Sequence, residues 1–274
     1  MIPPGEKVGL AIPECVDMRF SVLGSGSKGN SVYIEEGRTA ILIDNGFSGK
    51  ELEQRLSTIG RSLDNLTAIC VTHEHNDHIN GVGVVSRRCK VPVYANGGTF
   101  AGAEKKMGKP FRFIEFGTGD ELAIQDLEVR SFRISHDTAD PVGFVISNGR
   151  EYLGYCTDTG AVSKLMELRL ARCHGLILEF NHNLEMLKNG PYPLVLQQRV
   201  RSSQGHLANE DAGQFLKRLL HRNLKTTVLA HLSETNNTPE LALRAAIEAV
   251  GSEPCGELIV AEQQIPTRLL SLIA

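Results

Sequence analysis

Apolar positions along the chain follow two periodicities, which predict alternating strands and helices. Short apolar or alternating runs bounded by turn residues predict strands. These runs are Met18–Leu23, Ser31–Glu35, Ala40–Asp44, Leu66–Val71, Val91–Ala95, Val142–Ser147, Glu151–Cys156, Gly175–Glu179, Thr226–Ala230 and Leu258–Ala261, with Phe111–Ile134 also rich in strand. Apolar residues three or four positions apart predict helices, which are Lys50–Ile59, Ser163–Arg172, Asn209–Leu220, Glu240–Val250 and a shorter helix ending at Cys89.

Each half of the chain runs from strands into helices, so helices are available to cover both outer faces of paired sheets. Asn148 and Gly149 separate two predicted strands and indicate a tight hairpin. Residues 24–29 match the letters Gly-x-Gly-x-x-Gly, but a strand follows them, which indicates a glycine-rich hairpin and not a dinucleotide site. Residues 1–17 contain three prolines and read as an irregular extension, with Met18 as an alternative start. We therefore expect a single domain over residues 18–274.

Composition and charge narrow the class of protein. The 274 residues are 41% hydrophobic and 22% charged, which is ordinary for a globular protein. No apolar run approaches the length of about 18 residues that crosses a membrane, and no export signal is visible, so we expect a cytoplasmic protein without membrane contact. Six cysteines without Cys-x-x-Cys spacing indicate reduced thiols, buried at Cys70, Cys156 and Cys173. A net charge of −3 does not by itself indicate nucleic-acid binding.

Four side chains that commonly bind metal ions lie within six residues. His73, His75, Asp77 and His78 directly follow the apolar strand predicted at Leu66–Val71. The first two point the same way if the strand persists, and the other two lie on the following turn. Core packing does not require three imidazoles in six residues, and a solvated turn would not favour histidine over asparagine, serine or glycine. This hexapeptide therefore predicts the first ligands of two adjacent metal ions, an arrangement that hydrolytic enzymes use.

Three more predicted strands end on a coordinating side chain. His136 follows the strand-rich region, Asp158 follows Glu151–Cys156, and His231 follows Thr226–Ala230. Each position alone is compatible with core packing. Their repeated placement at strand ends indicates that they supply the missing metal ligands.

The complete pattern resembles the metallo-β-lactamase superfamily from Met18 to the end of the chain. The resemblance rests on the hexapeptide, on His136 in Ser-His-Asp, on Asp158 in Thr-Asp-Thr-Gly and on His231 in Ala-His-Leu-Ser. Further segments are similar to the YycJ/WalJ-type branch, which is associated with nuclease activity on DNA and is related to ribonuclease Z and a cyclic phosphodiesterase. These segments are Gly24–Ser31, Glu179–Asn183, Gly205–Asn209 and His231–Asn237.

The resemblance implies a fold, a ligand set and a nucleophile. The implied fold is α/β (α+β), a four-layer αβ/βα sandwich. The implied ligand sets are His73, His75 and His136 for one metal ion, Asp77, His78 and His231 for the other, and Asp158 bridging both. Such ligands suit two divalent ions, zinc or manganese, and are compatible with iron. A hydroxide held between the ions would attack the substrate, with Asp77 orienting it.

Four other residues are candidates for catalysis and substrate binding. His206 stands where phosphodiesterase relatives carry a non-ligand histidine, so we expect a general acid or a group that stabilises phosphate oxyanions. A helix-capping or surface role is its alternative. His182 follows a predicted strand and is a candidate substrate contact. Arg199 and Arg201 precede His206 and are candidates for holding phosphates, although such clusters are usually solvated.

These features predict a metal-dependent phosphodiesterase, namely an exonuclease that acts on single-stranded DNA from its 5′ end. One alternative is a phosphodiesterase for small cyclic substrates or nucleotides. Another is a thioester or lactam hydrolase, although zinc β-lactamases commonly carry a cysteine where Asp158 stands. The native metal, the preference for DNA or RNA, exonuclease or endonuclease action, and the oligomeric state stay open at this stage.

Overall fold

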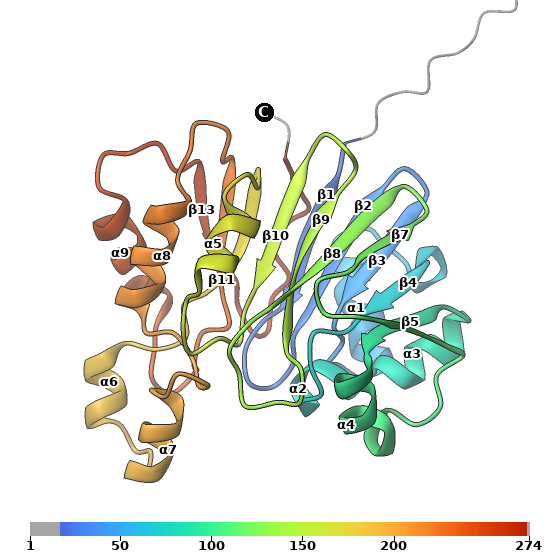
Figure 1. Cartoon of the computed structure of the whole chain (residues 1–274), viewed down its shortest axis with the longest axis horizontal. Coiled ribbons are helices and arrows are strands. Elements are labelled where there is room, and N and C mark those ends of the chain that lie inside the picture. The colour runs from blue at the N-terminus through green and yellow to red at the C-terminus, as the bar shows by residue number, and fades with distance from the viewer. Residues whose placement is uncertain (1–16, 273–274) are drawn as a thin grey trace, which may run out of the picture.

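The computed structural model describes residues 17–272, which form two seven-stranded sheets packed face to face, with helices on their outer faces (Figure 1). The first sheet has the order β14-β1-β2-β3-β4-β5-β6. Its strands are β1 (Arg19–Gly24), β2 (Ser31–Glu36), β3 (Thr39–Ile43), β4 (Ala68–Cys70), β5 (Pro92–Asn96), β6 (Arg112–Phe116) and β14 (Leu270–Ser271). Residues 1–16, which include Cys15 and nearly all of the predicted N-terminal extension, lie outside the described part of the chain. The prediction of an irregular extension therefore stays untested.

The second sheet has the order β13-β12-β11-β10-β9-β8-β7. Its strands are β7 (Glu121–Ile124), β8 (Leu127–Arg133), β9 (Val142–Ser147), β10 (Tyr152–Cys156), β11 (Gly175–Glu179), β12 (Thr226–Ala230) and β13 (Glu257–Val260).

Both sheets combine an antiparallel part with a parallel part. In the first sheet, β14, β1, β2 and β3 pair antiparallel, whereas β3 to β6 pair parallel. In the second, β7 to β10 pair antiparallel, whereas β10 to β13 pair parallel. Because the carboxyl ends of parallel strands meet at one edge of a sheet, the loops that follow them gather at one end of the molecule.

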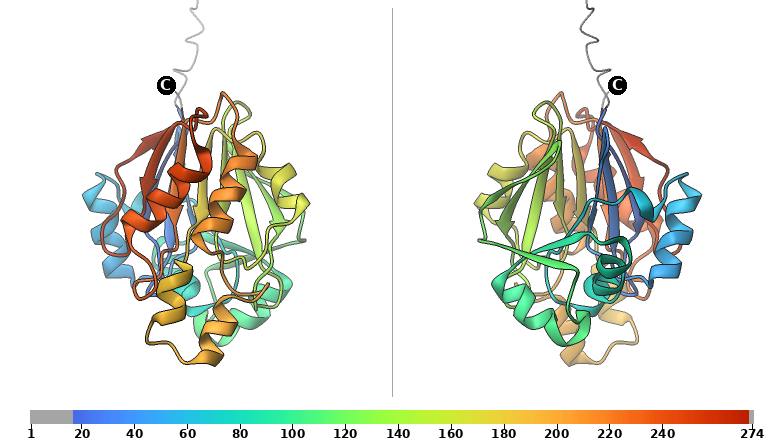
Figure 2. Two further views of the ribbon diagram at one scale, coloured as in Figure 1. Left: turned by 90° about the vertical axis from the view of Figure 1, so that its left-hand side faces the viewer. Right: turned by 90° about the vertical axis from the view of Figure 1, so that its right-hand side faces the viewer.

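Helices complete the four layers (Figure 2). The first sheet is covered by α1 (Gly49–Thr58), α3 (Val82–Cys89) and α4 (Gly97–Met107), and the second by α5 (Lys164–Leu170), α8 (Asn209–Leu219) and α9 (Pro239–Val250). One apolar core lies between the two sheets. A second core lies between the first sheet and its helices, and a third lies between the second sheet and its helices. The parallel strand β11 is accordingly buried on both faces, while β8 largely alternates between buried and exposed positions. The predicted four-layer sandwich is confirmed.

Most predicted elements are present, with three differences near the site. β4 ends at Cys70, so the strand does not continue to His75. A continuing strand was the condition under which His73 and His75 were expected to point the same way. The short helix α2 (Asn76–Ile79) begins instead, with His75 as its N-cap. The helices α6 (Leu184–Asn189) and α7 (Leu194–Val200) were not predicted, and they extend beyond the sandwich at the end where α2 lies (Figure 1). Among residues 17–272, no helix has the length and apolar character needed to cross a membrane.

Candidate metal centre

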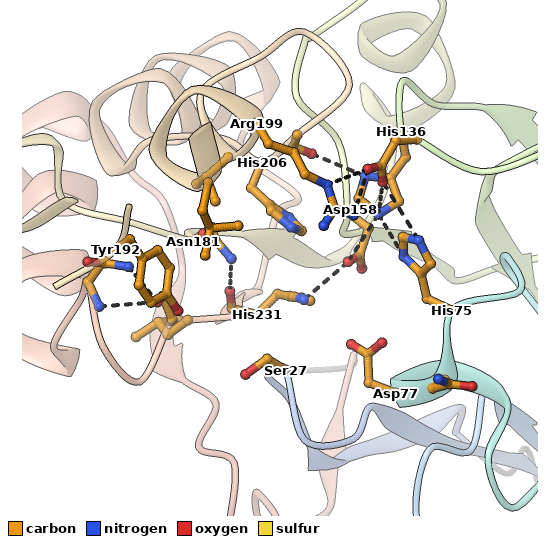
Figure 3. A pocket seen from close by; sticks show the side chains of 18 residues that line it. Ser27, His75, Asp77, His136, Asp158, Asn181, Tyr192, Arg199, His206 and His231 are labelled. Carbon is orange, nitrogen blue, oxygen red and sulfur yellow. Dashed lines mark hydrogen bonds and ion pairs between the residues drawn. The ribbon is translucent and has the colours of Figure 1, made fainter. Parts of the chain in front are cut away.

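The seven residues expected to bind metal come together in space. Figure 3 shows five of them, His75, Asp77, His136, Asp158 and His231, around one pocket. The first half supplies four of them from the loop after β4 and from α2, and the second half supplies three from the ends of β8, β10 and β12. Their nitrogen and oxygen atoms form groups whose members lie within 4.8 Å of one another. Three of these groups are His73, His75 and His136; Asp77, His78 and His231; and His73, His78 and Asp158.

The carboxylate of Asp158 lies between the two sets. Its Oδ1 is 3.1 Å from Nε2 of His231 and 3.9 Å from Nε2 of His136. Its Oδ2 is 3.4 Å from Nε2 of His78. One carboxylate therefore faces histidines from both ligand sets, as a bridging ligand would.

The buried polar atoms of the site fit divalent metal ions. His73 and His78 are fully buried, and Asp158 is 2% exposed. Nε2 of His73 and Oδ2 of Asp158 have no hydrogen-bond partner within the protein. Burying such atoms without partners is unfavourable, and mixed imidazole and carboxylate donors are ligands that zinc, manganese and iron accept. A bound cation would satisfy these atoms and offset the negative charge of the buried carboxylate.

Two of the imidazoles, those of His78 and His136, have a hydrogen-bond partner on their Nδ1 atom. Nδ1 of His78 lies 2.8 Å from Oδ2 of the buried Asp44, which also accepts hydrogen bonds from the backbone and hydroxyl of Thr72. Nδ1 of His136 lies 3.2 Å from the carbonyl oxygen of Gly205. These contacts leave both Nε2 atoms directed at the ligand groups. A group that accepts a hydrogen bond from the second ring nitrogen of a metal-binding histidine orients the ring and makes the metal-binding nitrogen more basic.

Asp44 was missed by the sequence-based assignment, although it too follows a strand. It lies directly after β3, and burial raises the pKa of its carboxyl, an effect that the adjacent His78 opposes. The loop that carries Asp44 packs closely against α2 at Gly46. A Cβ atom added to Gly46 would lie 1.9 Å from the carbonyl oxygen of Asp77. Only glycine allows the loop after β3 to pack against α2 in this way.

Three strand-end residues of the site adopt the left-handed backbone conformation. The φ angles of Asp44, Asp158 and His231 are 58°, 59° and 57°. Among the described non-glycine residues only two others, Lys90 and Gln125, have positive φ. This conformation is unfavourable for side chains with a Cβ and concentrates at functional sites. It turns the chain sharply where each strand ends.

His206 lies beside the ligands but pairs with a carboxylate. Its Nδ1 is 2.7 Å from Oε1 of Glu179, which ends β11, and the ring faces the same pocket as Asp158 and His231 (Figure 3). The other oxygen of Glu179 accepts hydrogen bonds from the backbone N–H groups of Thr159 and Leu207. Burial lowers the pKa of His206, but the charge and hydrogen bond of Glu179, together with the charges of Asp158 and Asp77, outweigh it and raise the pKa to about 9. Glu179 had not been predicted as a site residue.

A pocket of about 370 Å³ opens beside these residues. Arg199 lines it and is paired with Asp137, whose Oδ2 lies 2.6 Å from Nη2 of the guanidinium. Arg201 and His182 are not among the lining residues. His182 is 1% exposed, both its ring nitrogens lack hydrogen-bond partners, and burial lowers its pKa to about 4. Of the three candidate substrate contacts, the structure thus brings only Arg199 to the pocket.

The glycine-rich segment forms the turn between β1 and β2, as predicted, and closes one side of the site. Ser27 lines the pocket, and the side-chain amide of Asn30 donates to Oδ2 of Asp77 at 3.1 Å. The backbone N–H of Asn30 also donates to the carbonyl oxygen of Asp77 at 2.8 Å. This turn therefore holds the second ligand set in place.

Comparison with known proteins identifies relatives by sequence and by structure. A family model described as the beta-lactamase superfamily domain matches residues 39–232. The chain is 36% identical to the exodeoxyribonuclease YycJ of Bacillus anthracis over 92% of this chain and 98% of that protein. It is also 36% identical to the exodeoxyribonuclease WalJ of Streptococcus pneumoniae serotype 2, over 88% and 91%. The crystal structure of the metallo-beta-lactamase fold protein YhfI from Bacillus subtilis matches with a TM-score of 0.71 at 17% identity, covering 91% of this chain and 99% of that one, which shows a shared fold.

Proposed function

The chain belongs to the β-lactamase superfamily and is a metal-dependent hydrolase, and we propose that it is an exonuclease that degrades single-stranded DNA from the 5′ end with two divalent metal ions. The proposal extends to this chain the activity named for YycJ and WalJ, which it matches over most of its length. The observation that carries it is the Glu179–His206 pair beside a full set of metal ligands. Hydrolysis of a phosphodiester needs such a proton donor for its leaving oxygen.

Each residue has a distinct part in the proposed reaction. The ligand sets led by His73 and by Asp77 would each hold one ion, and Asp158 would contact both. When bound, the two ions lower the pKa of water and stabilise charge on the phosphoryl oxygens. Asp77, whose side chain is partly exposed to the pocket, would orient the attacking water.

Proton transfer to the leaving group falls to His206. The Glu179 carboxylate accepts from Nδ1, fixes the ring and favours its protonated form, so Nε2 is left as the donor to the leaving oxygen. Because Glu179 is 1% exposed and also accepts two backbone hydrogen bonds, its position does not depend on substrate.

The test uses purified protein loaded with Mn²⁺ or Zn²⁺ and a single-stranded DNA labelled at either end. Release of mononucleotides from the 5′ end, with slower action on RNA of the same sequence and on duplex DNA, is the expected result. Activity confined to small cyclic phosphates would replace the exonuclease with the phosphodiesterase alternative. Activity on thioesters or lactams without any on phosphodiesters would overturn both.

A further inference from the structure

The pocket beside the metal ligands has two chemically different walls (Figure 3). One wall carries the histidines and carboxylates described above. Tyr192 lies on the other side, across from His75 in Figure 3, and the aliphatic side chains of Leu196 and Leu232 also line the pocket. A site that held only a phosphoryl group would need no apolar wall. A pocket of about 370 Å³ with polar and apolar sides instead suits a group that combines a phosphate with a flat apolar ring.

Core packing does not account for the apolar side chains of α7. This helix has no buried residue, and Leu194 and Val195 are 67% and 78% exposed. Tyr192 precedes the helix and is only partly buried. Within residues 17–272 no other aromatic ring packs on it, whereas the exposed Tyr152 stacks on His174. The ring of Tyr192 therefore takes part in no aromatic stack within the described residues, and it lines the pocket beside the site.

Three contacts hold this wall in place. The Arg199–Asp137 ion pair ties α7 to the loop after β8. The backbone N–H of His206 donates to the carbonyl oxygen of Val200 at 2.8 Å, which joins the end of α7 to the proton donor. The side chain of Gln197 donates to the carbonyl oxygen of Tyr192 at 2.9 Å. The backbone that carries the aromatic ring is thus positioned relative to His206 before substrate binds.

We propose that Tyr192 is a stacking platform for the nucleobase next to the scissile phosphate, with Leu196 extending the same surface. This inference rests on the proposed nuclease function and names the part of the substrate that the apolar wall recognises. Every base offers a π face, so stacking accepts all four bases and selects nucleotides over phosphodiesters that lack a base. Tyr192 is accordingly a specificity residue and takes no part in bond breaking.

The experiment compares a DNA strand that has 2-aminopurine at its 5′ nucleotide with a matched strand that is abasic there. The chain contains no tryptophan, so 2-aminopurine fluorescence is read with little background from the protein. Binding is measured on the metal-loaded protein with a phosphorothioate strand that resists cleavage, and KM is measured on ordinary strands. Tyr192→Ala should abolish quenching and raise KM about tenfold for the base-bearing strand, with no change for the abasic strand.

Three variants control for structural effects. Tyr192→Phe keeps the ring and should behave as the wild type, whereas Tyr192→Leu keeps apolar bulk without the ring and should lose quenching. Tyr152→Ala removes an exposed tyrosine at the opposite end of β10 and should change nothing. Equal increases of KM on both strands, or quenching that survives in Tyr192→Leu, would overturn the stacking platform. Quenching that depends on Tyr192 without cleavage of any strand would support the platform and overturn the nuclease instead.

Discussion

The two halves of the molecule build the same kind of sheet but contribute to the metal centre in different ways. The first half supplies four ligands from six consecutive residues that follow β4. The second half supplies one residue each from the ends of β8, β10 and β12, and adds Glu179 from the end of β11. One half therefore depends on a short local segment, and the other depends on several strands lying in the correct register.

The register of the second sheet shows how this dependence works. Cys156, Leu178 and Leu229 are paired neighbours on β10, β11 and β12. Asp158 and His231 each lie two residues beyond their strand's paired residue, so they reach the same level at the edge of the sheet. A shift of one residue would turn a side chain to the opposite face. Long-range strand pairing is thus a condition for gathering the ligands of the second half, whereas the ligands of the first half are neighbours in sequence and need only contacts such as those from Asp44 and Asn30 to orient them.

The largest expected effect tests the bridging position in the second half. Asp158→Ala should lose both metal equivalents and all activity, because one carboxylate faces histidines of both ligand sets. His75→Ala, at the more exposed rim of the first set, should lose only one equivalent. Metal analysis of the purified variants measures both. Two full equivalents in Asp158→Ala would refute the bridging assignment.

The next effect separates proton donation from metal binding within the second half. His206→Ala should keep its metal content while kcat falls about 10²–10⁴-fold, the usual contribution of general acid catalysis. Glu179→Gln should show a smaller loss of the same kind, because it removes the charge that keeps His206 protonated. His221→Ala, far from the site, serves as the control. A lost metal equivalent would identify His206 as a ligand, and an unchanged kcat would remove it from the mechanism.

A smaller effect tests the local geometry of the first half. Asp44→Ala removes the carboxylate that orients His78, and such losses cost about 10- to 100-fold in metal affinity or activity. Competition with a chelator of known affinity measures the change. Excess metal should restore most of the activity, because every ligand is still present. No rescue by metal would mean that Asp44 mainly stabilises the fold.

The smallest effect concerns the arginines next to the second half of the site. Replacing Arg199 and Arg201 with alanine should raise KM for single-stranded DNA by about fivefold at most, since Arg199 is already paired with Asp137 and both side chains are exposed. The effect on bis-p-nitrophenyl phosphate should be smaller, because its single phosphate needs no contact along a strand. Equal effects on both substrates would exclude a role in holding the strand.

The contrast between the halves also explains how much could be predicted from sequence. The predicted strands mostly lie within one or two residues of the observed ones, because apolar runs report burial directly. The hexapeptide was recognisable because its ligands are adjacent. Asp44 and Glu179 were not identified because each acts through a neighbouring histidine, and a lone acid at the end of a strand carries no distinctive spacing. Helix α7 escaped detection because no residue of it is buried, so it has no periodic apolar face.

The left-handed residues at the strand ends are positions where backbone conformation alone would favour glycine. Glycine adopts that conformation freely, and a residue with a Cβ gives up about 1 kcal/mol there. Asp158→Gly would remove this cost, but it would also remove the buried carboxylate that lies 3.1 Å from His231 and 3.4 Å from His78, and breaking such buried pairs costs more than the backbone relief returns. The metal-free glycine variant should therefore melt at a lower temperature than the metal-free parent, and thermal denaturation in the presence of a chelator measures the difference. Engineering of this chain for stability should hold Asp44, Asp158 and His231 constant from the first round.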